Sequence, residues 1–230
     1  MSVTFPDQWV GYGLHDFRPV QSTYAQFDLG ACPVVPEVSD SFDWIAPPSE
    51  ELEADGMQIE HQSDEEFSSL LSRLQTSAPT ATPQSFWRFL GTEALRECPL
   101  SPTDCHWELS SDWIALPSLP DDRFVRFMSD SQYCYSWYLR VSADGSATVV
   151  ACAGIESEDF DLESPLIEDC PYLERPELES LVLSSVVTVA PSFSAFIYRL
   201  WIEGLIWFHQ YRRLPLSPSE EDYTCQLTPN

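Results

Sequence analysis

Side chains that could bind a metal come together once in the sequence, at Cys98, Cys105 and His106. A tetrahedral zinc site needs four converging ligands, which usually arrive as CxxC-like pairs. This segment supplies three candidate ligands and contains no such pair. We therefore expect no metal site and no bound cofactor. The three residues are interpreted as a loop thiol, a buried thiol and an interfacial histidine.

Patterns for nucleophilic or acid–base catalysis are also weak. The chain contains no GxSxG, Walker-type or GxGxxG pattern. Its histidines are His15, His61, His106 and His209. A dyad between one of them and Cys105 or Cys134 stays open, although no spacing favours it. Acidic residues are so abundant that no particular pair of carboxylates stands out. We predict that the protein is not an enzyme.

The polar segment Asp130-Ser131-Gln132 lies between two expected strands and has two interpretations. The side chains of Asp and Ser often hydrogen-bond their own backbone in turns. The segment could also contact a partner, and on that interpretation Asp130 and Gln132 are candidate binding residues. Trp137 and Tyr138 follow and point to opposite faces of a strand, so we expect one in the core and the other available to a partner.

Two windows of the chain are strongly acidic. Residues 50–66 carry eight acids and residues 156–179 carry ten, with Arg175 as the one base of the second window. A segment of that length between a meander and a helix is usually functional or disordered. Its interpretation as a solubilising loop also stays open. We predict that seven of its acids contact a basic partner: Glu156, Glu158, Asp159, Asp161, Glu163, Glu168 and Asp169.

Net charge excludes several classes of partner. The 230 residues include 37 acids and 11 bases, all of them arginine, which gives a formal charge of −26 and a pI near 4.1. Such a chain repels nucleic acid and anionic lipid and attracts basic surfaces. We therefore expect neither direct nucleic-acid binding nor membrane binding. The oligomeric state stays open.

Hydropathy and cysteine usage bear on the compartment. No apolar run reaches the roughly 18 residues of a membrane span, and the chain does not open with a signal-peptide pattern. Seven scattered cysteines without a CxxC pair do not suggest a full disulfide framework. Together these features predict a protein of the reducing cytoplasm.

Periodicity predicts the elements that must position these residues. Apolar residues at 67, 70, 71 and 74 indicate an amphipathic helix, and residues 84–90 form a short second one after Pro83. Strands are expected at 106–110 and 186–190. Alternation between 123 and 152, with a turn at Asp144-Gly145, indicates an antiparallel meander. Residues 193–208 read as a buried helix with a cap at Ser192 and with Arg199 and Glu203 on a narrow polar stripe.

The fold class expected from these elements is α+β, with a twisted, mainly antiparallel sheet flanked by helices. We divide the chain into an irregular N-terminal arm packed on the core at 1–48, a single α+β domain at 49–214 and a flexible acidic tail at 215–230. The arm is rich in Pro, Gly and aromatic residues without clear periodicity, and the tail carries three consecutive acids at 220–222.

Three blocks of the sequence resemble the SMI1/KNR4 (SUKH) superfamily. FVRFMSDSQ at 124–132, followed by WYL at 137–139 and DG at 144–145, is similar to its "RF…D.Q" and "WYL…dG" segments. PQSFWRFL at 83–90 resembles its "LP.sF..FL" helix. FSAFIYRLWIE at 193–203, ending in IWF, resembles its closing helix. The blocks span roughly residues 65 to 208, about 60% of the chain. Thr82 stands where such families often have leucine, and only Gly91 follows where they have a glycine-rich turn.

The resemblance implies an α+β fold and the role of a bacterial immunity protein, which binds and neutralises a toxin effector, frequently a nuclease. The cognate toxin would then be basic, to match the charge of this chain. Some relatives in such a family act as scaffolds, so a scaffold or regulatory adaptor without toxin binding is the alternative function.

Overall fold

The meander expected at 123–152 forms the centre of the sheet. β6 (Leu119–Asp130), β7 (Ser136–Val141) and β8 (Ala147–Cys152) pair antiparallel in sequence order. The turn between β7 and β8 contains Gly145, whose φ of 83° is disfavoured for residues with a side chain. β6 also extends further than predicted, because Ser129 still pairs with Ser136.

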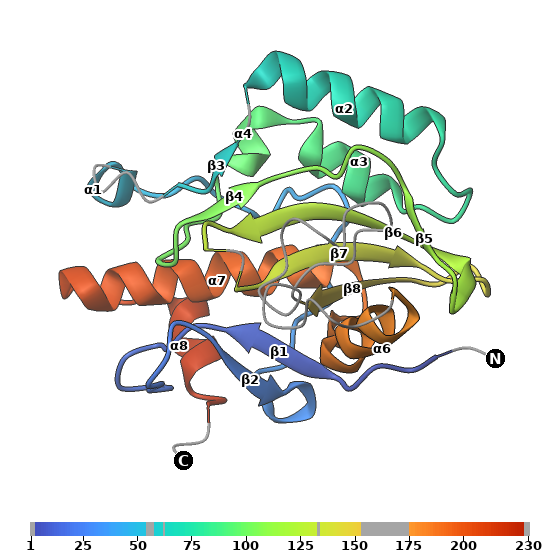
Figure 1. Cartoon of the computed structure of the whole chain (residues 1–230). Coiled ribbons are helices and arrows are strands. Elements are labelled where there is room, and N and C mark those ends of the chain that lie inside the picture. Colours follow the sequence, from blue (N-terminus) through green and yellow to red (C-terminus); the bar gives the residue numbers. More distant parts are fainter. Residues whose placement is uncertain (1–2, 54–57, 62, 133, 153–174, 228–230) are drawn as a thin grey trace.

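The computed structural model describes residues 3–53, 58–61, 63–132, 134–152 and 175–227. Within them, one seven-stranded sheet has the order β3-β4-β6-β7-β8-β9, and β5 (Ile114–Leu116) pairs with the first part of β6. β3 (Glu60–His61) runs parallel to β4 (Cys105–Trp107), and β9 (Val187–Ala190) runs antiparallel to β8. Figure 1 shows helices around a curled sheet. The fold is α+β, as predicted.

Helices α3 (Gln84–Leu90) and α7 (Phe193–Arg212) cover one face of this sheet. Ser192 caps α7, since its hydroxyl oxygen accepts a hydrogen bond from the Ala195 amide at 3.2 Å. The amphipathic helix α2 (Asp64–Thr76) lies outside α3, and the short α4 (Glu93–Arg96) follows α3 (Figure 1). In the described part of the chain, no helix is long and apolar enough to cross a lipid bilayer.

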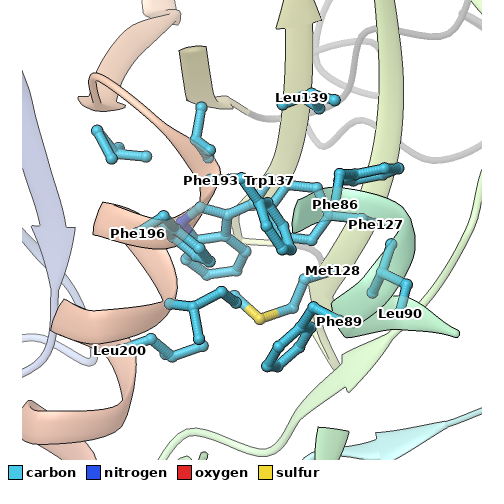
Figure 2. Packing of buried hydrophobic residues seen from close by; sticks show 14 of the residues in the cluster. Phe86, Phe89, Leu90, Phe127, Met128, Trp137, Leu139, Phe193, Phe196 and Leu200 are labelled. Atoms are coloured by element: carbon cyan, nitrogen blue, oxygen red, sulfur yellow. The ribbon is translucent and has the colours of Figure 1, made fainter. Parts of the chain in front are cut away.

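The core between these helices and the sheet is aromatic (Figure 2). Phe193, at the start of α7, has its ring centroid 5.0 Å from that of Phe86 and 5.2 Å from that of Phe127. Phe127 also contacts Phe196 one turn further along α7, at 5.5 Å. These near-perpendicular ring pairs add attraction to the burial of apolar area. They join α3, β6 and α7 into one unit.

The opposite face of the sheet is buried as well. Tyr138 packs there with residues of α6 (Arg175–Ser185), of β5 and of the N-terminal segment, including Phe5. Trp137 lies in the main core on the other side and is 2% exposed, while Tyr138 is fully buried. The alternation along β7 is therefore as predicted, but the expectation that one of the two rings is available to a partner is wrong. A second layer, which periodicity does not reveal, covers that face.

The N-terminal arm contains a β-hairpin and is less irregular than predicted. β1 (Gln8–Gly11) pairs antiparallel with β2 (Ala25–Asp28), and a 3-10 turn, η1 (Leu29–Ala31), follows. β1 lies beside β9, where the Thr188 amide donates to the Pro6 carbonyl at 2.8 Å. The hairpin thus covers an edge of the main sheet that would otherwise expose unpaired backbone groups.

The acidic chain end is also folded. α8 (Pro218–Thr224) begins with a capping box formed by Ser217 and Glu220. Glu220 and Tyr223 are buried, and Tyr223 packs against the outer side of α7. The prediction of a flexible tail from 215 onward is therefore wrong over these residues. The three consecutive acids suggested a solvated segment, although Tyr223 beside them is buried. A further short helix, α1 (Glu50–Glu53), lies in the first acidic window.

Candidate functional site

The seven acids predicted to contact a partner lie outside the residues that the structure describes: Glu156, Glu158, Asp159, Asp161, Glu163, Glu168 and Asp169. Their role stays a prediction. Of the first acidic window, Glu50, Glu60, Glu65 and Glu66 are described and exposed.

Asp130 is buried and its carboxylate is used inside the protein. Oδ1 accepts hydrogen bonds from the amides of Gln132 at 3.0 Å and Cys134 at 3.3 Å, which is the turn chemistry that the sequence suggested. Oδ2 lies 2.9 Å from the Tyr24 hydroxyl. Only Gln132 of the two candidate residues is exposed, so it alone of the pair is placed to touch a partner directly.

A small polar cluster surrounds Tyr24. Its hydroxyl oxygen lies 2.7 Å from Thr103 Oγ1 and 3.3 Å from Cys105 Sγ, in addition to Asp130. A charged acceptor binds the single phenolic proton more strongly than a neutral one, so we assign the donated bond to Asp130. Burial, followed by the nearby thiol of Cys105, raises the pKa of Tyr24.

The thiols of this region are poorly suited to nucleophilic catalysis. Burial raises the pKa of Cys105, and desolvation followed by the charge of Asp130 raises the pKa of Cys134. A thiol is reactive as its thiolate, so a raised pKa makes it inert near neutral pH. A small cavity of about 10 Å³ beside Cys105 is lined by Trp9, Tyr12, Tyr24, Trp137 and other residues, none of them histidine.

The three candidate zinc ligands are not brought together. The Cys98 thiol donates to the Ala94 carbonyl at 3.1 Å and packs in a cluster with α7 residues such as Ile202. Cys105 belongs to the main core instead. Over the described ranges, no group of three His, Cys, Asp or Glu side chains is arranged to hold a metal ion.

Arg199 and Glu203, predicted on the narrow polar stripe of a buried helix, are both buried themselves. Glu203 is fully buried, and Arg199 is 5% exposed. The Glu203 carboxylate binds the Arg18 guanidinium through two bonds, at 2.8 and 2.6 Å, and accepts further bonds from Trp9 Nε1 and the Tyr223 hydroxyl. The N-terminal arm and α8 cover this side of α7 and supply these partners.

A buried charge cluster, made of Arg18, Arg199, Glu203 and Tyr223, connects α8 with the N-terminal arm. Arg199 donates to the Tyr223 hydroxyl at 3.0 Å and to the Pro33 carbonyl at 3.0 Å. Burial, then the charge of Glu203, raises the pKa of Tyr223. The sequence signal for this cluster was two charges on an otherwise apolar helix, but their partners are too distant in the chain to be identified from it.

A hollow of about 490 Å³ borders the start of α3, and a groove of about 360 Å³ with aromatic side chains in its wall lies beside this cluster. The groove is lined by the β1–β2 connection, the Pro102-Thr103 loop and Trp207 of α7. The His15 ring centroid lies 5.0 Å from that of Trp207, which in turn stacks at 5.1 Å on Tyr211. The Tyr211 side chain is 60% exposed. Sequence analysis missed this site because its walls come from three distant segments.

The charge of the protein surface depends on which charged side chains are buried. Five of the arginines whose side chains the structure describes are buried, namely Arg18, Arg96, Arg126, Arg140 and Arg199. Among the described acids five are buried too, namely Asp122, Asp130, Glu179, Glu203 and Glu220. The two sets cancel, so the other residues carry the whole net charge of −26. The arginines also make interior ion pairs, as Arg140 does with Asp122 and Arg126 with Glu108.

Comparison with known proteins gives no matching family model, no matching curated protein and no matching solved structure.

Proposed function

We propose that this chain is a non-enzymatic immunity protein that binds and neutralises a basic protein toxin of the nuclease type. The observation that carries the proposal is the distribution of charge: five arginines are buried, several in ion pairs, while the excess of acids stays with the remaining residues. A surface of this kind selects basic partners and rejects polyanions.

The physics of inhibition supports such a partner. A nuclease exposes a basic cleft to the phosphate backbone of its substrate, and an acidic protein competes for the same cleft. Complementary charge also raises the association rate, to about 10⁸ M⁻¹s⁻¹ or more at low salt. An inhibitor that must meet its target before damage occurs benefits from this rate.

The state of the thiols agrees with a binding role. The pKa of Cys98 is raised to about 11 by burial and then by Glu97, and the pKa of Cys105 is raised by burial. These thiols are therefore protonated at neutral pH and do not supply a nucleophile.

The proposal is tested by using the full chain as bait in a lysate of the native host and identifying captured proteins by mass spectrometry. We expect a basic protein whose toxicity is suppressed when the two are produced together. Capture of a basic partner without toxicity would favour the adaptor alternative, and the absence of any basic partner would contradict the proposal.

The contribution of the second acidic window is tested with the same partner. A variant with its seven predicted contact acids changed to Asn or Gln should associate more slowly and with a weaker salt dependence. The matched control neutralises seven exposed acids elsewhere: Glu37, Glu65, Glu66, Glu93, Glu97, Asp112 and Asp121. Rates are compared from 50 to 500 mM salt, roughly a threefold change in Debye length. Equal effects of both variants would show that only net charge matters.

A further inference from the structure

The groove beside Trp207 is bordered by aromatic rings, and two exposed acids follow residues of its lining in the sequence. Three rings, those of His15, Trp207 and Tyr211, are joined by two contacts into a run from the β1–β2 connection to the end of α7. Tyr211 is one of only three exposed large hydrophobic side chains in the described chain, with Val3 and Val34. An exposed tyrosine stacked on a tryptophan is typical of the residues that dominate binding energy at interfaces.

The backbone of the groove also points to a specialised role. His15 has a φ of 46°, in the left-handed region that is uncommon for residues other than glycine. The connection is nonetheless held in place, because the Leu14 amide donates to the Arg18 carbonyl at 2.8 Å and Arg18 is bound to Glu203. The His15 ring is thus presented to Trp207 by a loop that is anchored on the buried charge cluster.

Two acids adjoin the groove in sequence. Asp16 follows His15, and Asp104 follows Thr103, a residue of the opposite wall. Both acids are exposed, and neither forms an ion pair with a described residue. The groove lining itself contains no arginine. These features favour a cationic ligand that can lie against aromatic rings.

We propose that this groove receives an arginine side chain of the basic partner, with its guanidinium against the aromatic run and within reach of Asp16 and Asp104. This inference rests on the proposed function and deepens it by naming the group that is recognised. Arginine fits better than lysine, because its planar guanidinium stacks on aromatic rings and forms paired bonds with carboxylates.

The groove is first tested without the partner. The probe is the peptide acetyl-Gly-Arg-Gly-amide, titrated into ¹⁵N-labelled full-length protein and followed by NMR. We expect shifts of the Trp207 indole N–H and of amides in residues 12–23. The matched peptide with citrulline, which keeps the shape and removes the charge, should give none. Equal shifts with citrulline, or shifts spread over distant acids, would overturn the proposal.

Substitutions then show which residues of the groove contribute to peptide binding. Tyr211→Ala, an exposed position, and the double change Asp16→Asn with Asp104→Asn should each weaken peptide binding about two- to fivefold. The control double change Asp112→Asn with Asp121→Asn removes the same charge from near β5 and the start of β6, away from the β1–β2 connection (Figure 1), and should leave binding unchanged. An equal loss of peptide affinity in both double variants would mean that only net charge matters, and it would contradict a specific site.

The same variants separate this inference from the proposed function. If a basic partner is captured and binds the Tyr211→Ala and Asp16/Asp104 variants as tightly as the unchanged protein, the groove is not its docking site although the function stands. If no basic partner is captured, the proposed function fails, and the peptide titration alone decides whether the groove binds arginine.

Discussion

Arg18 and Glu203 are 185 positions apart in the chain and form a buried, two-bond ion pair. Arg18 Nη1 lies 2.8 Å from Oε1 and Nη2 lies 2.6 Å from Oε2, while the two side chains are 7% and 0% exposed. Trp9 and Tyr223 donate further hydrogen bonds to the same carboxylate. One side chain of α7 therefore fixes the N-terminal hairpin, its connection and α8.

Loss of the charge on Glu203 should destabilise the protein strongly. Glu203→Gln leaves the Arg18 guanidinium buried without its counter-ion, so we expect the free energy of unfolding to fall by about 3–5 kcal/mol. The double change Arg18→Met with Glu203→Leu should recover part of that loss, because both members of the ion pair are removed together, while Arg199 stays buried and Trp9 and Tyr223 lose their acceptor. Urea denaturation measures both. Glu221→Gln, an exposed position of α8, serves as control and should change stability by less than about 0.5 kcal/mol. A stable Glu203→Gln variant would contradict this account.

Gly204 should resist substitution although it lies inside a helix. Replacing glycine by alanine inside a helix usually stabilises by about 0.5–1 kcal/mol. Here an added Cβ would lie 2.5 Å from the Leu100 carbonyl oxygen, which is backbone and cannot rotate away. We expect this clash to outweigh the gain in helix propensity, so Gly204→Ala should lower the free energy of unfolding by about 1–3 kcal/mol. Thermal melting followed by circular dichroism gives the sign. A higher melting temperature would mean that the backbone at Leu100 moves away from the added Cβ at little cost.

Tyr12→Phe should stabilise the protein or leave it unchanged. The Tyr12 hydroxyl is buried and has no hydrogen-bond partner among the described residues, and Tyr12 lines the small cavity that also borders Trp137. An unsatisfied buried polar group costs about 1–3 kcal/mol, and phenylalanine removes it while keeping the ring. Tyr24→Phe is the contrasting variant, since it removes a hydroxyl that lies 2.9 Å from Asp130, and it should destabilise. A clear loss of stability for Tyr12→Phe in urea denaturation would show that its hydroxyl has a partner.

The aromatic core should be intolerant of truncation. Phe196→Ala and Trp137→Ala each empty a fully packed position on opposite sides of one interface (Figure 2), and each should cost about 3–5 kcal/mol. That loss is a large part of a typical domain stability of about 5–15 kcal/mol. An unchanged melting temperature for either variant would mean that the side chain does not face the core. Tyr211→Ala, exposed on the same helix, is the control for Phe196.

Stability should fall at alkaline pH. Burial, then Glu97, raises the pKa of Cys98 from 9.0 to about 11, and burial also raises the pKa of Tyr24 and Tyr223 above 10.0. The unfolded chain loses these protons first, so the folded state binds more protons above about pH 9 and stability declines as pH rises. Below pH 9 the contribution is fully present. Thermal melts between pH 8 and 11 measure the decline.

Cys98→Ala should make that decline shallower between pH 9 and 11, while Cys225→Ala, which removes an exposed thiol, is the matched control. A melting temperature that stays constant from pH 9 to 11 would contradict the assignment.

The local spacing of apolar residues was sufficient to predict many of the helices and strands. The apolar spacing of residues 67–74, the alternation along 135–141 and the long apolar run after Ser192 led to α2, β7 and α7. Each of these signals lies within one element, because helix and strand periodicities depend on neighbouring residues only. The pairing of β6, β7 and β8 followed from their short connections.

Non-local packing decided the rest. The composition of the sequence determined a strongly acidic protein, and its periodicity determined an α+β chain with an antiparallel meander. Only the tertiary structure decided that Tyr138 is covered by α6 and Phe5, that Glu203 faces Arg18, and that Trp207 meets His15. Each of these contacts joins segments far apart in the chain. Whether a charged or aromatic residue is exposed depends on which distant segment packs over it, and neither propensity nor spacing carries that information.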